Sequence, residues 1–232
     1  MTISSRDFAA ILAPTAADLR QHVDELRDLD AALGDGDLGV TVELGCKAMS
    51  VYLEANTETD IGRMLIQLGM HINRANPSTF GTLLASAFMG AGRAVQFNSQ
   101  LANSQLAKSE LTADDLLRMG DGAIDAIKKR GKAEAGDKTM LDSLVPAVEE
   151  SRKALESGST FLEALGSATR ASEAGLNATA TMKAKFGRAS WRPDRGVGLK
   201  DGGAAAMHIL VHRFTENLRR VLLDQPNRDS GP

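Results

Sequence analysis

The sequence is poor in residues that form disulfides or stack on bases, with one cysteine, one tryptophan and one tyrosine among 232 residues. The lone Cys46 cannot form an internal disulfide, and we expect it to be a small core residue in a reducing compartment. Isolated aromatic residues such as Tyr52 and Trp191 do not build a base-stacking platform. No Ser/His/Asp or Cys/His constellation is visible, so covalent catalysis is not expected.

Long apolar runs and strong net charge are also missing. No apolar run is long enough to cross a membrane, and the N-terminal segment MTISSRDFAAILAPTAADLR has acidic residues and a proline where a signal peptide needs an apolar core. Lys and Arg number 27 against 30 for Asp and Glu, a formal net charge of −3. Such a balance offers no overall attraction to nucleic acid or anionic membranes. We therefore expect a soluble, cytoplasmic protein that binds neither.

Strand patterns are nearly absent, whereas apolar residues recur at the three- and four-residue spacing of helices. Capping signatures that begin with Thr15, Thr112 and Thr160 predict helix starts. Pro14 is expected to kink the first helix or to mark a restart within it. The pattern predicts eight helices, near residues 4–30, 39–55, 60–74, 80–96, 112–131, 139–157, 160–184 and 202–223.

The chain shows no internal repeat and no low-complexity linker, although residues 96–110 form a polar connection. Its length suits a single core. We expect one all-α domain over residues 1–232, with residues 224–232 as a frayed tail.

The segment LDAALGDGDLGVT (residues 29–41) has the G-x-G-x-x-G spacing of dinucleotide-binding turns. That motif must follow a strand, yet the preceding LRDLDAAL is helical in composition and period. The glycine match is therefore accidental.

The same segment holds three carboxylates, Asp30, Asp35 and Asp37. Such a cluster is tolerable if the carboxylates are fully solvated or share a cation, and hard oxygen ligands suit Mg²⁺. Glycines let the turn bend so that Asp35 and Asp37 return toward Asp30. The spacing alone leaves two interpretations open, a metal site and a solvated acidic loop that caps the helix beginning near Gly39.

Three further loops are candidates for anion contacts. Residues 129–141 and the cationic, glycine-rich residues 183–207 each lead into a helix, as an anion site would, but a plain capped loop and a solvated basic loop are open alternatives. The segment NPSTFGT (residues 76–82) offers either ligand contacts through Ser78 or Thr79, or an ordinary N-cap. His208 and His212 share a helix face but lack the Glu of a zinc hydrolase motif, so we expect packing or surface roles.

Three segments together resemble the L subunit, the nucleotide-binding or DhaL-type domain, of dihydroxyacetone kinases. They are LDAALGDGDLGVT, DGAIDAIKKRGKAEAGDKTMLDSLVPAVE and TMKAKFGRASWRPDRGVGLKDGGA, in the family's order, and the resemblance covers nearly the whole chain. It implies an antiparallel eight-helix barrel whose loops at one end hold two Mg²⁺ ions and ATP or ADP. Asp30, Asp35 and Asp37 would be the metal ligands.

The resemblance also implies a nucleotide site. Residues 38–41 would lie against the phosphates, Gly131 and Met140 would flank the adenine or ribose, and Arg188 would contact phosphate. The implied nucleotide-binding residues are Leu38, Gly39, Val40, Thr41, Ala75, Asn76, Gly131, Met140, Arg188, Asp201, Gly202 and Gly203. Two positions depart from the family pattern: Leu38 replaces a histidine, and Asn73–Pro77 replaces a Gly-Gly-x-Ser-Gly run.

The implied activity is that of one subunit of a kinase. A phosphoryl group would pass from ATP, or from a bound nucleotide rephosphorylated by a phosphotransferase-system protein, to a small ketose or polyol held on a separate K-type subunit. We also expect a homo-oligomer, and no catalytic side chain beyond the metal and phosphate ligands. The alternative is a non-catalytic regulator or scaffold that retains the metal site.

Overall fold

The computed structural model describes residues 2–75, 77–101, 108–191 and 193–224, with only the backbone for 97–101. The helices are α1 (Ser5–Arg20), α2 (Val23–Ala31), α3 (Leu38–Ala55), α4 (Ile61–Ala75), α5 (Thr79–Leu101), α6 (Ala113–Gly131), α7 (Leu141–Glu156), α8 (Phe161–Ala178) and α9 (Gly202–Leu223). Three 3₁₀ helices lie between α8 and α9: η1 (Thr179–Thr181), η2 (Arg188–Trp191) and η3 (Pro193–Gly196). Strand β1 (Ile3–Ser4) pairs antiparallel with β2 (Glu110–Leu111).

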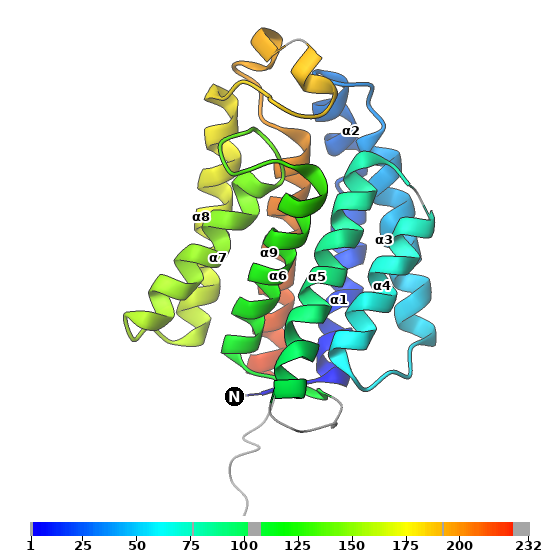
Figure 1. Cartoon of the computed structure of the whole chain (residues 1–232), viewed down its shortest axis with the longest axis vertical. Helices are drawn as coiled ribbons and strands as arrows, with labels where there is room; N and C mark the ends of the chain where they lie inside the picture. The colour runs from blue at the N-terminus through cyan, green and yellow to red at the C-terminus, as the bar shows by residue number, and fades with distance from the viewer. Residues whose placement is uncertain (1, 76, 102–107, 192, 225–232) are drawn as a thin grey trace, which may run out of the picture.

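Eight of these helices stand side by side and close into a ring (Figure 1). From α3 to α9 each helix packs against the next, α9 packs against α1, and α1 packs against α3. Neighbours in the ring run in opposite directions, and the short α2 continues α1 at one end, where it contacts α3 and α9. The predicted all-α, antiparallel eight-helix barrel is confirmed.

The helices are held by apolar stripes that face the interior. On α4 the fully buried Ile61, Leu65, Leu68 and Ile72 recur at three- and four-residue spacing. Burying each such side chain contributes about 1.5–3 kcal/mol. At the seam between α5 and α6 the backbones touch, since a Cβ on Gly90 would lie 2.2 Å from the carbonyl oxygen of Gly122.

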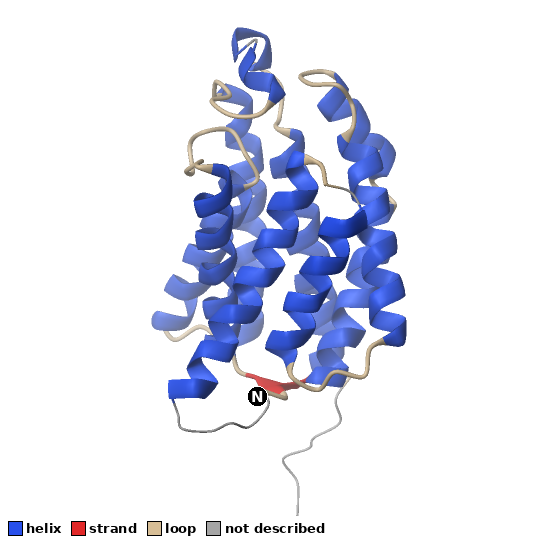
Figure 2. Ribbon diagram, turned by 45° about the vertical axis from the view of Figure 1, so that its right-hand side comes forward, coloured by secondary structure: helices blue, strands red, loops and turns tan. Residues whose placement is uncertain are grey.

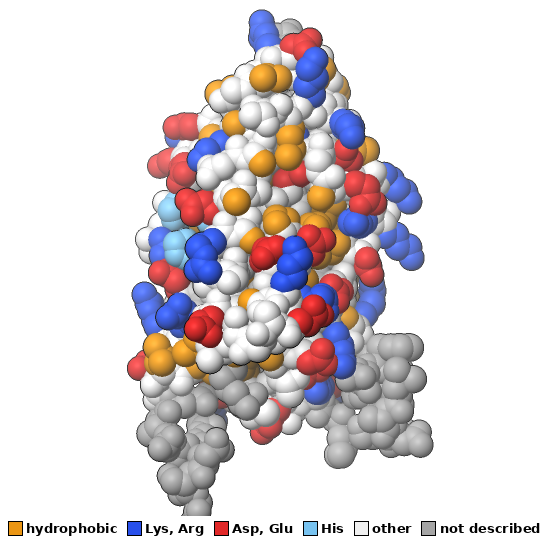
Figure 3. All heavy atoms as spheres, turned by 90° about the vertical axis from the view of Figure 1, so that its left-hand side faces the viewer, with side chains coloured by type: hydrophobic (Ala, Val, Ile, Leu, Met, Phe, Trp, Pro, Cys, Tyr) orange, Lys and Arg blue, Asp and Glu red, His pale blue; other side chains and the backbone are white. Residues whose placement is uncertain are grey.

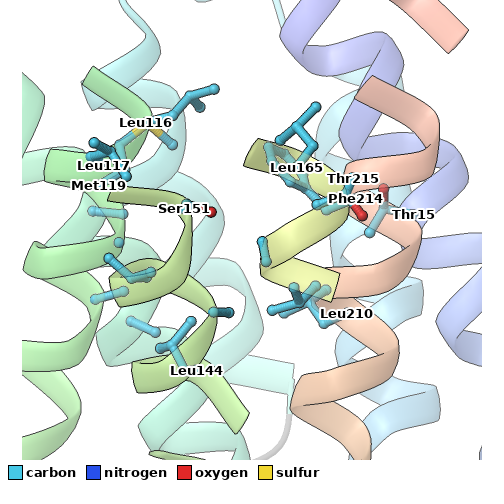
Figure 4. A pocket seen from close by; sticks show the side chains of 18 of the residues that line it. Thr15, Leu116, Leu117, Met119, Leu144, Ser151, Leu165, Leu210, Phe214 and Thr215 are labelled. Atoms are coloured by element: carbon cyan, nitrogen blue, oxygen red, sulfur yellow. The ribbon is translucent and has the colours of Figure 1, made fainter. Parts of the chain in front are cut away.

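Side chains do not fill the barrel completely. An apolar cavity of about 220 Å³ lies inside the barrel, lined by side chains of α1 and of α4 to α9. Leu116, Leu144, Leu210 and Phe214 are among them (Figure 4). None of the described helices is both long enough and apolar enough to cross a membrane.

The N-terminal helix differs from the prediction. The expected helix over residues 4–30 is two helices, separated at Gln21 and His22, while Pro14 lies inside α1 without ending it. Thr15 starts no helix, because its hydroxyl donates to the carbonyl oxygen of Ile11 (2.7 Å), as threonines inside helices do. The capping box of α1 is instead formed by Ser4 and Asp7.

Other boundaries agree more closely. Thr112 and Thr160 cap α6 and α8 in reciprocal capping boxes, as predicted. The predicted end of the helix over residues 160–184 is wrong, since α8 ends at Ala178 and a 3₁₀ helix follows. Helix α5 continues to Leu101, into the segment predicted as a polar connection. Residues 102–107, and the predicted tail from residue 225 onward, lie outside the described residues.

Candidate metal and nucleotide site

Connections between helices gather at one end of the barrel, at the top of Figures 1 and 2. The acidic turn (residues 30–37) leads into α3, residues 132–140 lead from α6 to α7, and the late loop (residues 179–191 and 193–201) leads from α8 to α9. Because neighbouring helices are antiparallel, every second connection falls at the same end. Segments far apart in the sequence therefore meet there.

The acidic turn reverses the chain tightly. Asp30 lies in the last turn of α2, and its backbone oxygen accepts the N–H of Leu33 (3.0 Å). Gly36 has a φ of +75°, in the left-handed region that favours glycine. The chain then returns, so that the first N–H of α3, on Leu38, donates to Oδ2 of Asp30 (3.4 Å).

This reversal brings the three predicted metal ligands together. Asp30, Asp35 and Asp37 each offer a carboxylate oxygen, and these oxygens lie within 4.8 Å of one another. Burial raises the pKa of Asp30, and the charges of Asp37 and Asp35 raise it further. The hydrogen bond from the Leu38 N–H lowers this pKa but does not outweigh them. Three hard oxygen donors at this spacing fit a divalent cation such as Mg²⁺.

Arg188 reaches this cluster from the late loop. Its Nη1 contacts a carboxylate oxygen of Asp35 and lies 2.9 Å from Oδ2 of Asp37. The predicted phosphate ligand is thus beside the predicted metal ligands. Two other cations of the loop are paired as well but largely exposed, Lys183 with Asp194 (2.7 Å) and Lys185 with Asp137 (2.5 Å).

The first turn of α3 packs closely against α2. A Cβ on Gly39 would lie 2.6 Å from the backbone oxygen of Val23, so only glycine permits this approach. Leu38 is buried, Val40 is 54% exposed, and the buried Thr41 donates its hydroxyl to Ser78 Oγ (3.0 Å). This contact joins α3 to the start of α5.

Ser78 acts as an ordinary N-cap, one of the two alternatives that the sequence left open. Its Oγ accepts the N–H of Gly81 (3.0 Å), three residues into the helix. The preceding Pro77 is exposed, and Asn76 lies outside the described residues.

The start of α9 completes this end of the barrel. Asp201 caps the helix by accepting the N–H of Ala204 (2.7 Å), and burial raises its pKa to about 6. A Cβ on Gly202 would lie 2.9 Å from a methyl of Leu38, and one on Gly203 would lie 3.6 Å from the backbone nitrogen of Met140. Residues 201–203 therefore join the acidic turn to the start of α7.

The remaining predicted residues lie farther along the rim. Ala75 ends α4, and Gly131 ends α6, where a Cβ would meet only the side chain of Leu83, at 3.1 Å. Both helix ends face the same end of the barrel as the acidic turn (Figure 1).

The sequence analysis missed two residues, Lys138 between α6 and α7 and Asp142 in the first turn of α7. Asp142 is buried, and its carboxylate accepts the N–H groups of Gly136 (2.5 Å) and Thr139 (2.6 Å). Lys138 is buried with a φ of 61° and donates to carbonyl oxygens of the late loop. A buried lysine gives no sequence signal, because lysines are almost always exposed. The Asp142 signal was present, as an acidic residue at the start of a helix.

His208 and His212 lie one turn apart on α9, with ring centroids 5.8 Å from each other. Within the described part of the chain, only the aspartate trio forms a group of three or more side chains spaced to hold a metal. His212 Nε2 lies 3.5 Å from Oε1 of Glu216, one turn farther along α9. On the face drawn in Figure 3, histidine side chains lie among acidic and basic ones.

Comparisons with known proteins place similar sequences in one family. The family model described as the DAK2 domain matches residues 32–216. The ADP-binding subunit DhaL of a PEP-dependent dihydroxyacetone kinase from Escherichia coli is 33% identical over half of this chain and 51% of its own length. A Listeria innocua protein with the corresponding name is 29% identical over 62% of each chain. The matches thus span about half to three fifths of these relatives.

Solved structures agree in fold. The dihydroxyacetone kinase of C. freundii in complex with AMP-PNP and Mg²⁺ superposes with a TM-score of 0.67 at 22% identity, covering 93% of this chain and 34% of that one. Its native form gives a TM-score of 0.65. This similarity concerns the fold, which in the larger protein is one part of the chain.

Proposed function

Because the chain belongs to the DAK2 domain family, we propose that it is the nucleotide- and Mg²⁺-binding subunit of a dihydroxyacetone-type kinase. The observation that carries this proposal is the convergence of Asp30, Asp35 and Asp37 with Arg188 at the end of the barrel where α3 and α9 begin. The named relatives are ADP-binding kinase subunits, and one solved relative holds AMP-PNP and Mg²⁺. We propose ATP or ADP and two Mg²⁺ ions as the ligands.

The three carboxylates would hold the metal. Bound there, Mg²⁺ supplies charge neutralisation for the phosphoryl group. The first residues of α3, Leu38 to Thr41, and the glycines at the start of α9 would bind phosphate oxygens, because the partial positive charge of a helix N-terminus attracts anions. Arg188 would turn from the carboxylates to a phosphate. The base and ribose would lie beside Ala75, Asn76, Gly131 and Met140.

The chain would supply half of a larger enzyme. We propose that the acceptor, a small ketose or polyol, is held on a K-type subunit, and that the donor is ATP or a phosphotransferase-system protein. Exposed apolar side chains on the late loop support docking at this end, namely Phe186, Trp191, Val197 and Leu199. Residues 1–232 would form one domain, assembled as a homo-oligomer in the cytoplasm.

Calorimetric titration with ADP, with and without Mg²⁺, tests the proposal. We expect binding that requires Mg²⁺, and Asp35→Asn should weaken it by at least about tenfold because a charged ligand is lost. Asp28→Asn is the matched control, since Asp28 is an exposed carboxylate on α2 that pairs with Arg27. Equal weakening by both variants, or unchanged affinity in Asp35→Asn, contradicts the metal assignment.

Activity separates the kinase from the alternative. Mixed with a K-type subunit and dihydroxyacetone, the protein should support phosphorylation from ATP or from a phosphorylated phosphotransferase protein, and the productive donor identifies the branch. A protein that binds no nucleotide under any condition would instead be a non-catalytic regulator.

A further inference from the structure

Lys138 forms the most completely buried cationic contact in the described part of the chain. Its side chain is 1% exposed and follows a backbone φ of 61°. The ammonium donates to the carbonyl oxygens of Thr179 (2.8 Å), Gly196 (2.6 Å) and Leu199 (2.6 Å), and the carbonyl oxygen of Met182 lies 3.4 Å away. An ammonium has three N–H groups, and here each has a close acceptor.

These acceptors come from both ends of the late loop. Thr179 and Met182 lie at its start, and Gly196 and Leu199 lie near its end. A second bond ties the same two ends, from the N–H of Gly198 to the carbonyl oxygen of Ala180 (2.7 Å). The loop is therefore closed at its base around one cation, and η2 projects from this base.

The closed loop carries Arg188 to the acidic turn. Arg188 begins η2, between the two ends that Lys138 joins, and contacts Asp35 and Asp37. Near the base, a Cβ on Gly196 would lie 3.7 Å from the Leu33 side chain and 3.6 Å from Lys138 Nζ. The base of the loop is thus packed between Lys138 and the acidic turn.

We propose that Lys138 is a positioning residue that holds the late loop closed, so that Arg188 is kept at the metal and phosphate site. The part of this proposal that concerns nucleotide binding rests on the function proposed above. Because the hydrogen-bond acceptors of Lys138 are backbone oxygens of the loop, the exposed loop side chains stay available for a partner.

Loop order is tested first, without any ligand, by Lys138→Met. Trp191, the single tryptophan, lies in η2 and reports loop motion through its fluorescence anisotropy. The variant should lower this anisotropy and speed tryptic cleavage after Lys185 and Arg188 by about tenfold or more, since charge-assisted hydrogen bonds are lost. Unchanged anisotropy and cleavage would overturn the proposal.

Lys108→Met is the matched control, because Lys108 pairs with the buried Asp115 at the opposite end of the barrel (2.9 Å). This variant should lose stability and leave the late loop unchanged. If Lys138→Met lacks the helical circular dichroism of the wild type, Lys138→Gln replaces it, since an amide can still donate to two of the carbonyls. Faster cleavage of the late loop in the control as well would show a general loss of stability and contradict the proposal.

The route through Arg188 is tested by a double-mutant cycle in the affinity for Mg²⁺ and ADP. If Lys138 acts by placing Arg188, Lys138→Met weakens binding in the wild type by about tenfold but adds little to Arg188→Ala. Additive losses would show that Lys138 acts elsewhere. A wild type without ADP binding refutes the proposed function, while the loop measurements still decide the role of Lys138.

Discussion

Gly39 has no room for a methyl group, whereas Gly45 has room for one. A Cβ there would lie 2.6 Å from the Val23 backbone oxygen and 2.8 Å from Arg27 Cβ, whereas a Cβ on Gly45 of the same helix meets only a methyl of Ile72 at 3.9 Å. Both glycines lie in α3, Gly39 in its first turn and Gly45 in its interior.

We therefore predict opposite effects of two alanine substitutions. Gly39→Ala should lower the free energy of unfolding by about 1–3 kcal/mol through overpacking. Gly45→Ala should raise it by about 0.5–1 kcal/mol, because alanine loses less conformational entropy on folding. Urea denaturation followed by circular dichroism measures both, and a stabilising Gly39→Ala would show that α2 moves away easily.

At the residue scale, the sequence identified candidate site residues where residue type or family pattern gave a signal. The aspartates of the acidic turn and Arg188 were identified from residue type and family pattern, and the structure brings them together. Lys138 was not identified, because its partners are backbone oxygens 41 to 61 residues away and any residue type can supply those. A contact to a carbonyl oxygen leaves no trace in the sequence of its acceptor.

At the scale of single elements, a threonine three residues before an acidic residue predicted three helix starts. Two of these predictions are confirmed and one is wrong. Thr112 and Thr160 follow non-helical segments, so their hydroxyls cap α6 and α8. Thr15 is preceded by a helix already started at Ser5, and its hydroxyl bonds backward to Ile11 instead. The helix break at Gln21 and His22 contains no glycine or proline, so the sequence carries no signal that predicts it.

The cap of α6 also predicts a pH dependence. Burial alone would raise the pKa of Asp115, but hydrogen bonds from Thr112 and the Lys108 ammonium outweigh burial and lower this pKa below its ordinary value of 3.8. A depressed carboxyl pKa contributes stability above the unfolded value, and this contribution is lost as the pH falls through the folded value. We expect the free energy of unfolding to fall below about pH 4.

Denaturant titrations between pH 7 and pH 2.5 measure this contribution. Asp115→Asn should be less stable at neutral pH and should show a shallower loss on acidification. Thr160→Ala, which removes the exposed cap of α8 and with it the hydrogen bond that lowers the pKa of Glu163, should lower stability by about 1 kcal/mol at neutral pH and leave the contribution of Asp115 in place. An acid slope in Asp115→Asn equal to that of the wild type would assign the loss to other carboxylates.

At the scale of the whole molecule, the ring makes every seam part of one closed structure. Each barrel helix packs on two neighbours, so opening one seam exposes the inner faces of all of them. At the α5–α6 seam the backbones approach closely from both sides, with Cβ positions on Gly90 and Gly122 at 2.2 Å and 2.6 Å from the carbonyl oxygens opposite. No side chain can be accommodated there without separating the helices.

Gly90→Ala should therefore destabilise the whole barrel, by about 3 kcal/mol or more, because backbone atoms rather than a flexible side chain oppose the methyl. Gly166→Ala in α8 is the control, since its Cβ would meet only the mobile end of Arg170 at 3.3 Å. Thermal unfolding should stay a single transition in both variants, shifted to lower temperature only in Gly90→Ala. Two separate transitions in Gly90→Ala would show that α5 and α6 belong to independently folding halves, and that the ring is not one cooperative unit.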